Sequence, residues 1–234
     1  MTYLLWNKIP MLGNQKKLLV LRGLAGVTSM TLFFYAITYM SVGTAVSLRY
    51  LYPIFAAILA VYFLKEKIYK LQWFFFFMAF VGVLFIKGFD ASVNAIGLTL
   101  VLISAFFSGI VYILIAKIGT RDHPVVIVNY FMWIATILGG ILALFYWEMP
   151  KGIEWFLLLS LGVFGYFGQL FMTKAFQIGK ANKVLPIKYV EVVFTMIFST
   201  IWLNTSYPIL SIFGIVLIIT GLLLNMFYKQ KLKN

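Results

Sequence analysis

Eight long apolar runs, separated by short polar connections, dominate this sequence of 234 residues. Each run is close to the about 20 residues that an α-helix needs to cross ~30 Å of hydrocarbon. A backbone inside lipid must satisfy its own hydrogen bonds, so runs of this length predict transmembrane helices. The predicted helices cover residues 18–39, 43–64, 71–89, 96–117, 124–147, 154–178, 183–203 and 207–228.

The composition is typical of a protein embedded in lipid. Hydrophobic residues make up 63% of the chain and charged residues 11%, and the mean hydropathy is +1.01. This leaves too little polar surface for a soluble globule of this size, so we expect the lipid bilayer as a partner. The net charge of +13 does not indicate nucleic acid, because the Lys and Arg residues lie between apolar runs instead of forming one basic face.

Side chains that would carry enzymatic or metal chemistry are scarce. The sequence has no Cys, and its single histidine, His123, lies beside Asp122 and Pro124 in a predicted loop. No Ser-His pair, paired Asp or His-rich cluster falls within the predicted spans. We therefore expect neither an enzyme nor a bound metal or cofactor.

The basic residues predict how the chain crosses the membrane, because Lys and Arg concentrate in cytoplasmic loops. With the N-terminus inside, the outer connections hold only two of them, Lys87 and Lys151. The cytoplasmic segments then hold the basic clusters, such as Lys65 with Lys67 and Lys180 with Lys183. We predict a multi-pass protein of the cell membrane, inner or plasma, with both termini in the cytoplasm.

The sequence also matches itself when it is shifted by 139 positions without a gap. The shift moves each predicted helix five helices along the chain, which is an odd number, so the two copies cross the membrane in opposite directions. This predicts an inverted repeat, an architecture of many secondary transporters. The pairs that carry most weight are Gly23 with Gly162, Gly26 with Gly165, Gly82 with Gly221, Arg49 with Lys188, and Tyr50 with Tyr189.

The two copies define two predicted domains of one all-α polytopic fold. An incomplete first repeat covers residues 1–89 with the first three predicted helices, and a second repeat covers residues 96–228 with the other five. Small residues at helical spacing, Gly162, Gly165 and Gly168, predict a surface where helix backbones pack closely.

Short motifs follow one another in a fixed order, five of them in the first half of the chain and four in the second. They are Leu21-Arg22-Gly23, Phe34-Tyr35-Ala36, Tyr52-Pro53-Ile54-Phe55-Ala56-Ala57-Ile58-Leu59-Ala60, Leu64-Lys65-Glu66-Lys67, Gly82-Val83-Leu84, Gly168-Gln169, Ala175-Phe176, Tyr189-Val190-Glu191-Val192-Val193-Phe194 and Gly214-Ile215-Val216-Leu217. In this order and spacing they resemble the drug/metabolite transporter superfamily, and in particular its EamA-type members.

That resemblance implies a fold. The family has ten helices in two five-helix halves, so the chain looks like an eight-helix form without the first two. It is then a truncated product, a sequence with a mis-called start, or a variant completed by a partner chain. The second half also has Val192 where the family usually has Pro.

Charged residues inside spans are the strongest candidates for a transport site, because burying one costs roughly 2.5–3.5 kcal/mol even on a lenient scale. Glu191 lies about eight residues into the predicted helix 183–203, which places it at ~12 Å depth. Its carboxylate could accept a proton or another cation during a transport cycle. The alternative is a structural ion pair with Lys188, three residues earlier on the same helix face.

Two basic residues occupy equivalent places in the repeats. Arg49 and Lys188 could clamp an anionic or zwitterionic substrate, or both could extend along their helices to the headgroups. The guanidinium of Arg49 is the better match for a carboxylate or phosphate.

Polar side chains supply the remaining candidates. Tyr50, Tyr52 and Tyr189 could line a central cavity, and Gln169 lies near the middle of its span. The alternative for each is an interhelical hydrogen bond, which in membranes contributes ~0.6 kcal/mol on average.

These features favour a secondary transporter for a small-molecule substrate, working by alternating access and coupled to a cation through Glu191. The resemblance implies amino acids and nucleotide-like compounds as candidate substrates, and the two basic residues in spans favour an organic anion or zwitterion. The alternative is a non-transporting truncated protein or a subunit that requires a partner, and a homodimer is one option for assembly.

Overall fold

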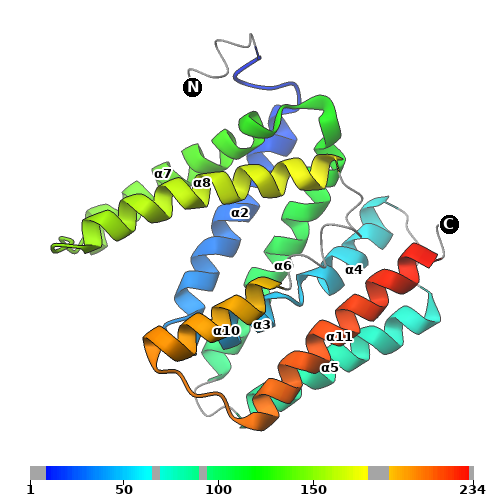
Figure 1. Cartoon of the computed structure of the whole chain (residues 1–234). Helices are drawn as coiled ribbons and strands as arrows, with labels where there is room; N and C mark the ends of the chain where they lie inside the picture. The colour runs from blue at the N-terminus through cyan, green and yellow to red at the C-terminus, as the bar shows by residue number, and fades with distance from the viewer. Residues whose placement is uncertain (1–8, 65–68, 90–93, 179–189, 232–234) are drawn as a thin grey trace. The chain divides into compact units, whose positions relative to one another are not determined.

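The computed structural model is all-helical in the residues that it describes, 9–64, 69–89, 94–178 and 190–231 (Figure 1). Within these residues, six segments are long and apolar enough to cross a membrane, and shorter apolar helices cover 70–86 and 194–203. The predicted all-α polytopic fold is thus confirmed. The elements are α2 (Lys16–Ala36), α3 (Val42–Arg49), α4 (Tyr52–Leu64), α5 (Lys70–Phe89), α6 (Ala95–Ile118), the 3₁₀ turn η1 (Gly119–Arg121), α7 (Pro124–Tyr146), α8 (Glu154–Ile178), α10 (Val190–Leu203) and α11 (Ile209–Lys231).

One predicted helix, over residues 43–64, is not continuous in the structure. The run 43–64 forms two helices, α3 and α4, with a turn at Tyr50 and Leu51 between them. Pro53 explains the break, since it has no N–H to donate to the carbonyl of Arg49 and its ring would clash with that carbonyl in a continuous helix. The backbone tightens instead, and Leu51 N–H donates to the Leu48 carbonyl oxygen at 3.1 Å.

The described residues divide into two compact units. The first contains residues 1–27 and 114–179, and the second contains residues 28–113 and 180–234. Helices α2 and α6 contribute residues to both units. Each unit draws on both predicted repeats, so the repeat boundaries at 1–89 and 96–228 stay a prediction.

The first unit is organised around the loop between α6 and α7. The buried carboxylate of Asp122 accepts hydrogen bonds from the backbone N–H groups of Asn14 and Gln15, just before α2 begins. Unpaired N–H groups and the helix dipole favour a negative charge at that position. The Gln177 side chain of α8 donates to the carbonyl oxygens of Gly119 and Asp122 in the same loop. The loop therefore ties the ends of α2 and α8 together.

His123 in this loop caps the start of α7. Its Nδ1 accepts the backbone N–H of Val125 at 3.3 Å. Burial lowers the pKa of His123 from its usual 6.5, and the nearby Lys174 lowers it further. The neutral imidazole, which can accept this hydrogen bond, is therefore the form that the fold favours.

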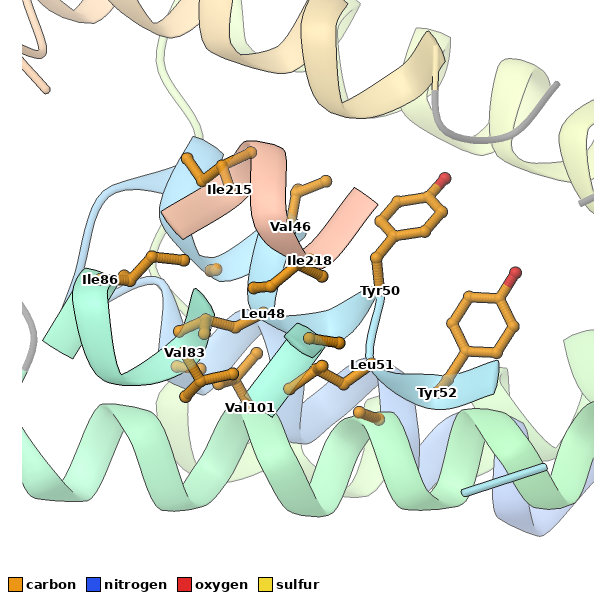
Figure 2. Packing of buried hydrophobic residues seen from close by; sticks show 14 of the residues in the cluster. Val46, Leu48, Tyr50, Leu51, Tyr52, Val83, Ile86, Val101, Ile215 and Ile218 are labelled. Carbon is orange, nitrogen blue, oxygen red and sulfur yellow. The ribbon is translucent and has the colours of Figure 1, made fainter. Parts of the chain in front are cut away.

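The second unit holds the larger hydrophobic core. Aliphatic side chains from α3, α5, α6 and α11 fill it, among them Leu48, Val83, Val101 and Ile218 (Figure 2). Ile218 and Leu48 are fully buried. Burial of such side chains stabilises the fold by roughly 1.5–3 kcal/mol each.

Helices α5 and α11 lie side by side in this unit (Figure 1). A Cβ built at Gly82 would meet the Gly214 carbonyl oxygen at 2.5 Å, and one built at Gly221 would meet the Phe75 carbonyl oxygen at 2.8 Å. Only glycine allows the two backbones to approach this closely. Farther along the same contact, the Gln72 side chain donates to Asn225 Oδ1 at 2.8 Å, and both residues are buried.

These glycine contacts are related by the offset found in the sequence. Adding 139 to Gly82 gives Gly221, and adding 139 to Phe75 gives Gly214. The contact of Gly82 with Gly214 and the contact of Gly221 with Phe75 are therefore the same contact seen from each helix in turn. Such self-complementarity is the pattern of a two-fold interface, here within one chain.

The glycines of α8 that were predicted to form a close packing surface have no neighbouring helix backbone close to them in the part of the chain that the structure describes. No atom among the described residues lies within 4 Å of a Cβ built at Gly162, Gly165 or Gly168. Their repeat equivalents on α2 do pack closely, since Cβ atoms at Gly23 and Gly26 would meet α7. The two copies thus differ in what covers their glycines.

Candidate functional site

The break between α3 and α4 positions two of the predicted tyrosines. Tyr50 follows the last residue of α3, and Tyr52 is the first residue of α4. Both residues are 4% exposed. Figure 2 shows their side chains at one edge of the core, with both hydroxyls directed away from the aliphatic side chains. The break therefore presents two phenol groups on the same side.

Glu191 meets this break from another helix. It lies in the first turn of α10, and the Tyr50 hydroxyl donates to Glu191 Oε2 at 2.7 Å. Carboxylates are stabilised in a first helical turn by the helix dipole. The Glu191 side chain is exposed, and no cation within the described ranges forms an ion pair with it. Its side-chain partner among the described residues is thus a neutral hydroxyl.

Arg49 lies next to Tyr50, at the last position of α3. Its guanidinium carbon lies 4.6 Å from the centre of the Phe33 ring, a cation–π contact, and its Nε donates to Ser108 Oγ at 3.4 Å. Ser108 Oγ is in turn 2.8 Å from Ser29 Oγ. The side chain is half-buried, and none of the acidic residues that the structure describes pairs with it.

A row of aromatic rings continues from Tyr50 into α6. The Tyr50 and Tyr52 rings are 5.8 Å apart, and Tyr52 stacks on Tyr112 at 4.4 Å. The site therefore combines a carboxylate, a guanidinium and aromatic rings from α3, α4, α6 and α10. The described residues contain no group of three or more His, Cys, Asp or Glu side chains that could hold a metal ion.

Three predicted site residues do not belong to the described part of this site. Lys188 and Tyr189 fall outside the described residues, and so does the alternative ion pair between Lys188 and Glu191. Gln169 belongs to the first unit, where its Oε1 accepts a hydrogen bond from Arg22 Nη2 at 2.9 Å. The bond joins α2 to α8, and an interhelical hydrogen bond is the alternative interpretation given above for Gln169.

Arg22 is a charged residue that sequence reasoning missed as a site candidate. It is 1% exposed, and its guanidinium carbon lies 4.8 Å from the centre of the Phe131 ring. The predicted helix 18–39 places Arg22 close to its end, where a long side chain reaches the headgroups. Helix α2 begins two residues earlier, at Lys16, so Arg22 lies farther from the helix end than the hydropathy pattern indicated.

Comparison with known proteins connects this geometry to a family. The EamA-like transporter family matches residues 1–88 and 95–227, which is nearly the whole chain. The chain belongs to this family. The resemblance seen in the motifs is thereby confirmed, and the chain is a multi-pass membrane protein of the EamA-like type.

Curated relatives of this EamA-like chain are transporters with different cargoes. The pseudopaline exporter CntI of Pseudomonas aeruginosa is 30% identical over 206 residues, which cover 87% of this chain and 72% of that protein. The S-adenosylmethionine uptake transporter of Rickettsia prowazekii is 30% identical over 213 residues, 91% and 72% of the two chains. Human solute carrier family 35 member G1 is 31% identical over 225 residues, 86% and 60%.

A solved crystal structure also shares the fold of this EamA-like chain. It matches with a TM-score of 0.69 over 100% of this chain and 84% of the other, at 16% sequence identity. At that identity the match concerns the fold alone.

Proposed function

We propose that this protein is a secondary transporter that moves a small metabolite across the membrane by alternating access. The substrate is an amino acid, a nucleotide-like compound, or another organic anion or zwitterion. The observation that carries the proposal is the hydrogen bond from Tyr50 to Glu191, which joins a broken helix to the first turn of another helix. Helix ends inside a membrane fold are where transporters bind charged substrates and ions.

The relatives support the proposal that this protein is a transporter. The pseudopaline exporter and the S-adenosylmethionine uptake transporter are named as proteins that carry small molecules across membranes. One is an exporter and the other an uptake transporter, so the property that they share is the transport of a small molecule.

Glu191 is the coupling residue in the proposed cycle. An exposed carboxylate with one neutral hydroxyl partner can take up a proton or another cation without breaking an ion pair within the described site. Protonation removes the charge from the end of α10 and weakens the charge-assisted hydrogen bond from Tyr50. A weaker hydrogen bond between the end of α3 and α10 is the step that would link cation binding to the movement of helices.

The internal repeat supports two further candidates for the transport site. Lys188 corresponds to Arg49 and Tyr189 corresponds to Tyr50 under the 139-residue offset. We propose that Lys188 and Tyr189 serve the second half of the site as Arg49 and Tyr50 serve the first. We also propose that both termini are cytoplasmic, on the strength of the basic residues in the inner connections.

Transport in proteoliposomes tests the proposal. Glu191→Gln preserves the shape of the side chain and its ability to accept the Tyr50 hydroxyl, but it removes the titratable charge. We expect coupled uptake or efflux under an imposed proton or sodium gradient to be abolished, while the protein stays folded in detergent. The matched control is Glu148→Gln, which neutralises an exposed carboxylate beyond the end of α7 and should transport normally. Unchanged transport by Glu191→Gln would remove the coupling role.

A further inference from the structure

Basic side chains gather at one end of the first unit. The start of α2, the end of α6, the turn η1 and the last two turns of α8 contribute them, and every one is exposed. We call this set the basic patch; its members are Lys16, Lys17, Lys117, Arg121 and Lys174. All of them belong to the same compact unit, so the contacts within that unit fix their relative positions.

Hydrogen bonds tie the start of α2 to the end of α6. The Asn14 side chain donates to the carbonyl oxygen of Arg121 at 2.8 Å, and the Gln15 side chain donates to that of Ile118 at 3.0 Å. The two lysines of α2 follow Gln15 directly, and Lys117 directly precedes Ile118. The basic residues of α2, α6 and η1 are therefore neighbours.

The end of α8 joins the same group. Gln177 donates to the carbonyl oxygens of Gly119 and Asp122, and Lys174 lies three residues before it on the helix. Burial lowers the pKa of His123, and the charge of Lys174 lowers it further, which agrees with a position of Lys174 close to this loop. The ends of α2, α6 and α8 meet here (Figure 1).

The positive charge of the basic patch is not compensated at this end of the unit. The described acidic residue here is Asp122, which is 3% exposed and already accepts backbone N–H groups that precede α2. No member of the patch forms an ion pair with an acidic residue that the structure describes. At the other end of α7 and α8 the balance is reversed, since Lys151 lies there with Glu148 and Glu154.

The position of the patch on the helices indicates which anion it meets. Helices α2, α6 and α8 are long and apolar enough to span a membrane, so their ends lie at the level of the lipid headgroups. Below the cations the helix surfaces are apolar: Leu21 shares a face of α2 with Lys17, and Phe171 shares a face of α8 with Lys174. Leu21 is 52% exposed and Phe171 is 64% exposed. A charged end above an apolar surface matches a phospholipid better than a soluble anion.

We propose that the basic patch is a binding site for an anionic phospholipid, whose headgroup phosphate pairs with the Lys and Arg side chains while its acyl chains lie along α2 and α8. Clusters of Lys and Arg at the ends of membrane helices attract anionic headgroups. The bound lipid contacts several helix ends at once, so it should stabilise the first unit. The inference is independent of the proposed transport function, because it uses none of the residues assigned to transport.

Native mass spectrometry of the purified full chain in a non-ionic detergent tests the inference. Phosphatidylglycerol, which is anionic, and phosphatidylcholine, which is neutral overall, are added with identical acyl chains, and the affinity of each is measured. The test variants are Lys174→Gln and its double variant with Lys117→Gln. Lys174→Arg keeps the charge, and Lys151→Gln removes an exposed lysine from the other end of the same unit.

We expect the wild type to prefer phosphatidylglycerol, and each neutralised lysine of the patch to weaken that binding about fivefold, or about 25-fold in the double variant. Phosphatidylcholine should bind all variants alike, and Lys174→Arg and Lys151→Gln should bind phosphatidylglycerol as the wild type does. Added salt should reduce the preference of the wild type, because it screens exposed charges. Phosphatidylglycerol should also raise the Tm of the wild type more than that of the double variant.

Three results would overturn the inference. The first is equal affinity of the wild type for the two lipids, and the second is an equal loss of phosphatidylglycerol binding in Lys151→Gln and Lys174→Gln. The third is displacement of phosphatidylglycerol by inorganic phosphate, which would make the patch a site for a soluble anion. The salt dependence of the wild type needs no substitution, so the inference stays testable even if the double variant does not fold.

Discussion

A methyl group at Gly82 should force α5 and α11 apart and destabilise the protein. An ideal Cβ there would lie 2.5 Å from the Gly214 carbonyl oxygen, whereas ordinary contact begins at 3.4 Å, so the backbones must separate by about 0.9 Å. The obstructing atom is backbone and cannot rotate aside. Overpacking of this kind typically costs about 1–3 kcal/mol. For a chain of this length that free energy corresponds to a Tm lower by about 2–12 °C.

The assay is thermal unfolding of Gly82→Ala in detergent, followed by far-ultraviolet circular dichroism at one scan rate. Gly221→Ala should behave alike, because its Cβ would meet the Phe75 carbonyl oxygen at 2.8 Å. The matched control is Gly162→Ala on α8, where nothing lies within 4 Å. Alanine there improves helix propensity by up to about 1 kcal/mol, so its Tm should stay equal or rise. Equal Tm values for Gly82→Ala and Gly162→Ala would refute the close-packing argument.

Two further predictions concern polar groups that hold helices together. Gln72→Leu leaves the buried Asn225 side chain without its hydrogen-bond donor and should lower the free energy of unfolding by about 1–3 kcal/mol. The double variant Gln72→Leu with Asn225→Leu should recover part of that loss, because neither polar group is then left unpaired. A double variant that is less stable than the single one would contradict this. Because burial lowers the pKa of His123 in the folded protein, its contribution to stability is complete above pH ~6.5 and is lost as the pH falls below that value. His123→Asn retains a helix cap without titrating, so the decrease of its Tm with falling pH should be smaller than in the wild type, and an identical profile would argue against the role of His123.

The helices were predictable because lipid imposes a simple rule on length and polarity. The bounds of α2, α5, α6, α7, α8 and α11 agree with the predicted runs within three residues at each end. The break at Tyr50 and Leu51 was missed because hydropathy is insensitive to backbone geometry. Pro53 was the residue that indicated the break, because it cannot donate a hydrogen bond to the carbonyl of Arg49. A hydropathy pattern does not register this effect, since Pro53 lies within an apolar run.

The site was only partly predictable, because single residues can be ranked by charge while their partners depend on tertiary packing. Arg49, Tyr50, Tyr52 and Glu191 were named from their positions in spans, and the structure brings Tyr50 and Glu191 into contact. No periodicity could indicate that Tyr50 would bond a residue 141 positions away. The internal repeat predicted equivalent positions, but equivalence does not specify which members touch.

The most direct test of a transport site at Tyr50 and Glu191 is the current that substrates evoke on a solid-supported membrane. Proteoliposomes with the wild type, Glu148→Gln and Glu191→Gln are exposed to the same free amino acids and S-adenosylmethionine. We predict transient currents for the wild type and for Glu148→Gln, and none for Glu191→Gln. Currents of equal size in Glu191→Gln would contradict the central claim that this carboxylate carries the transport cycle.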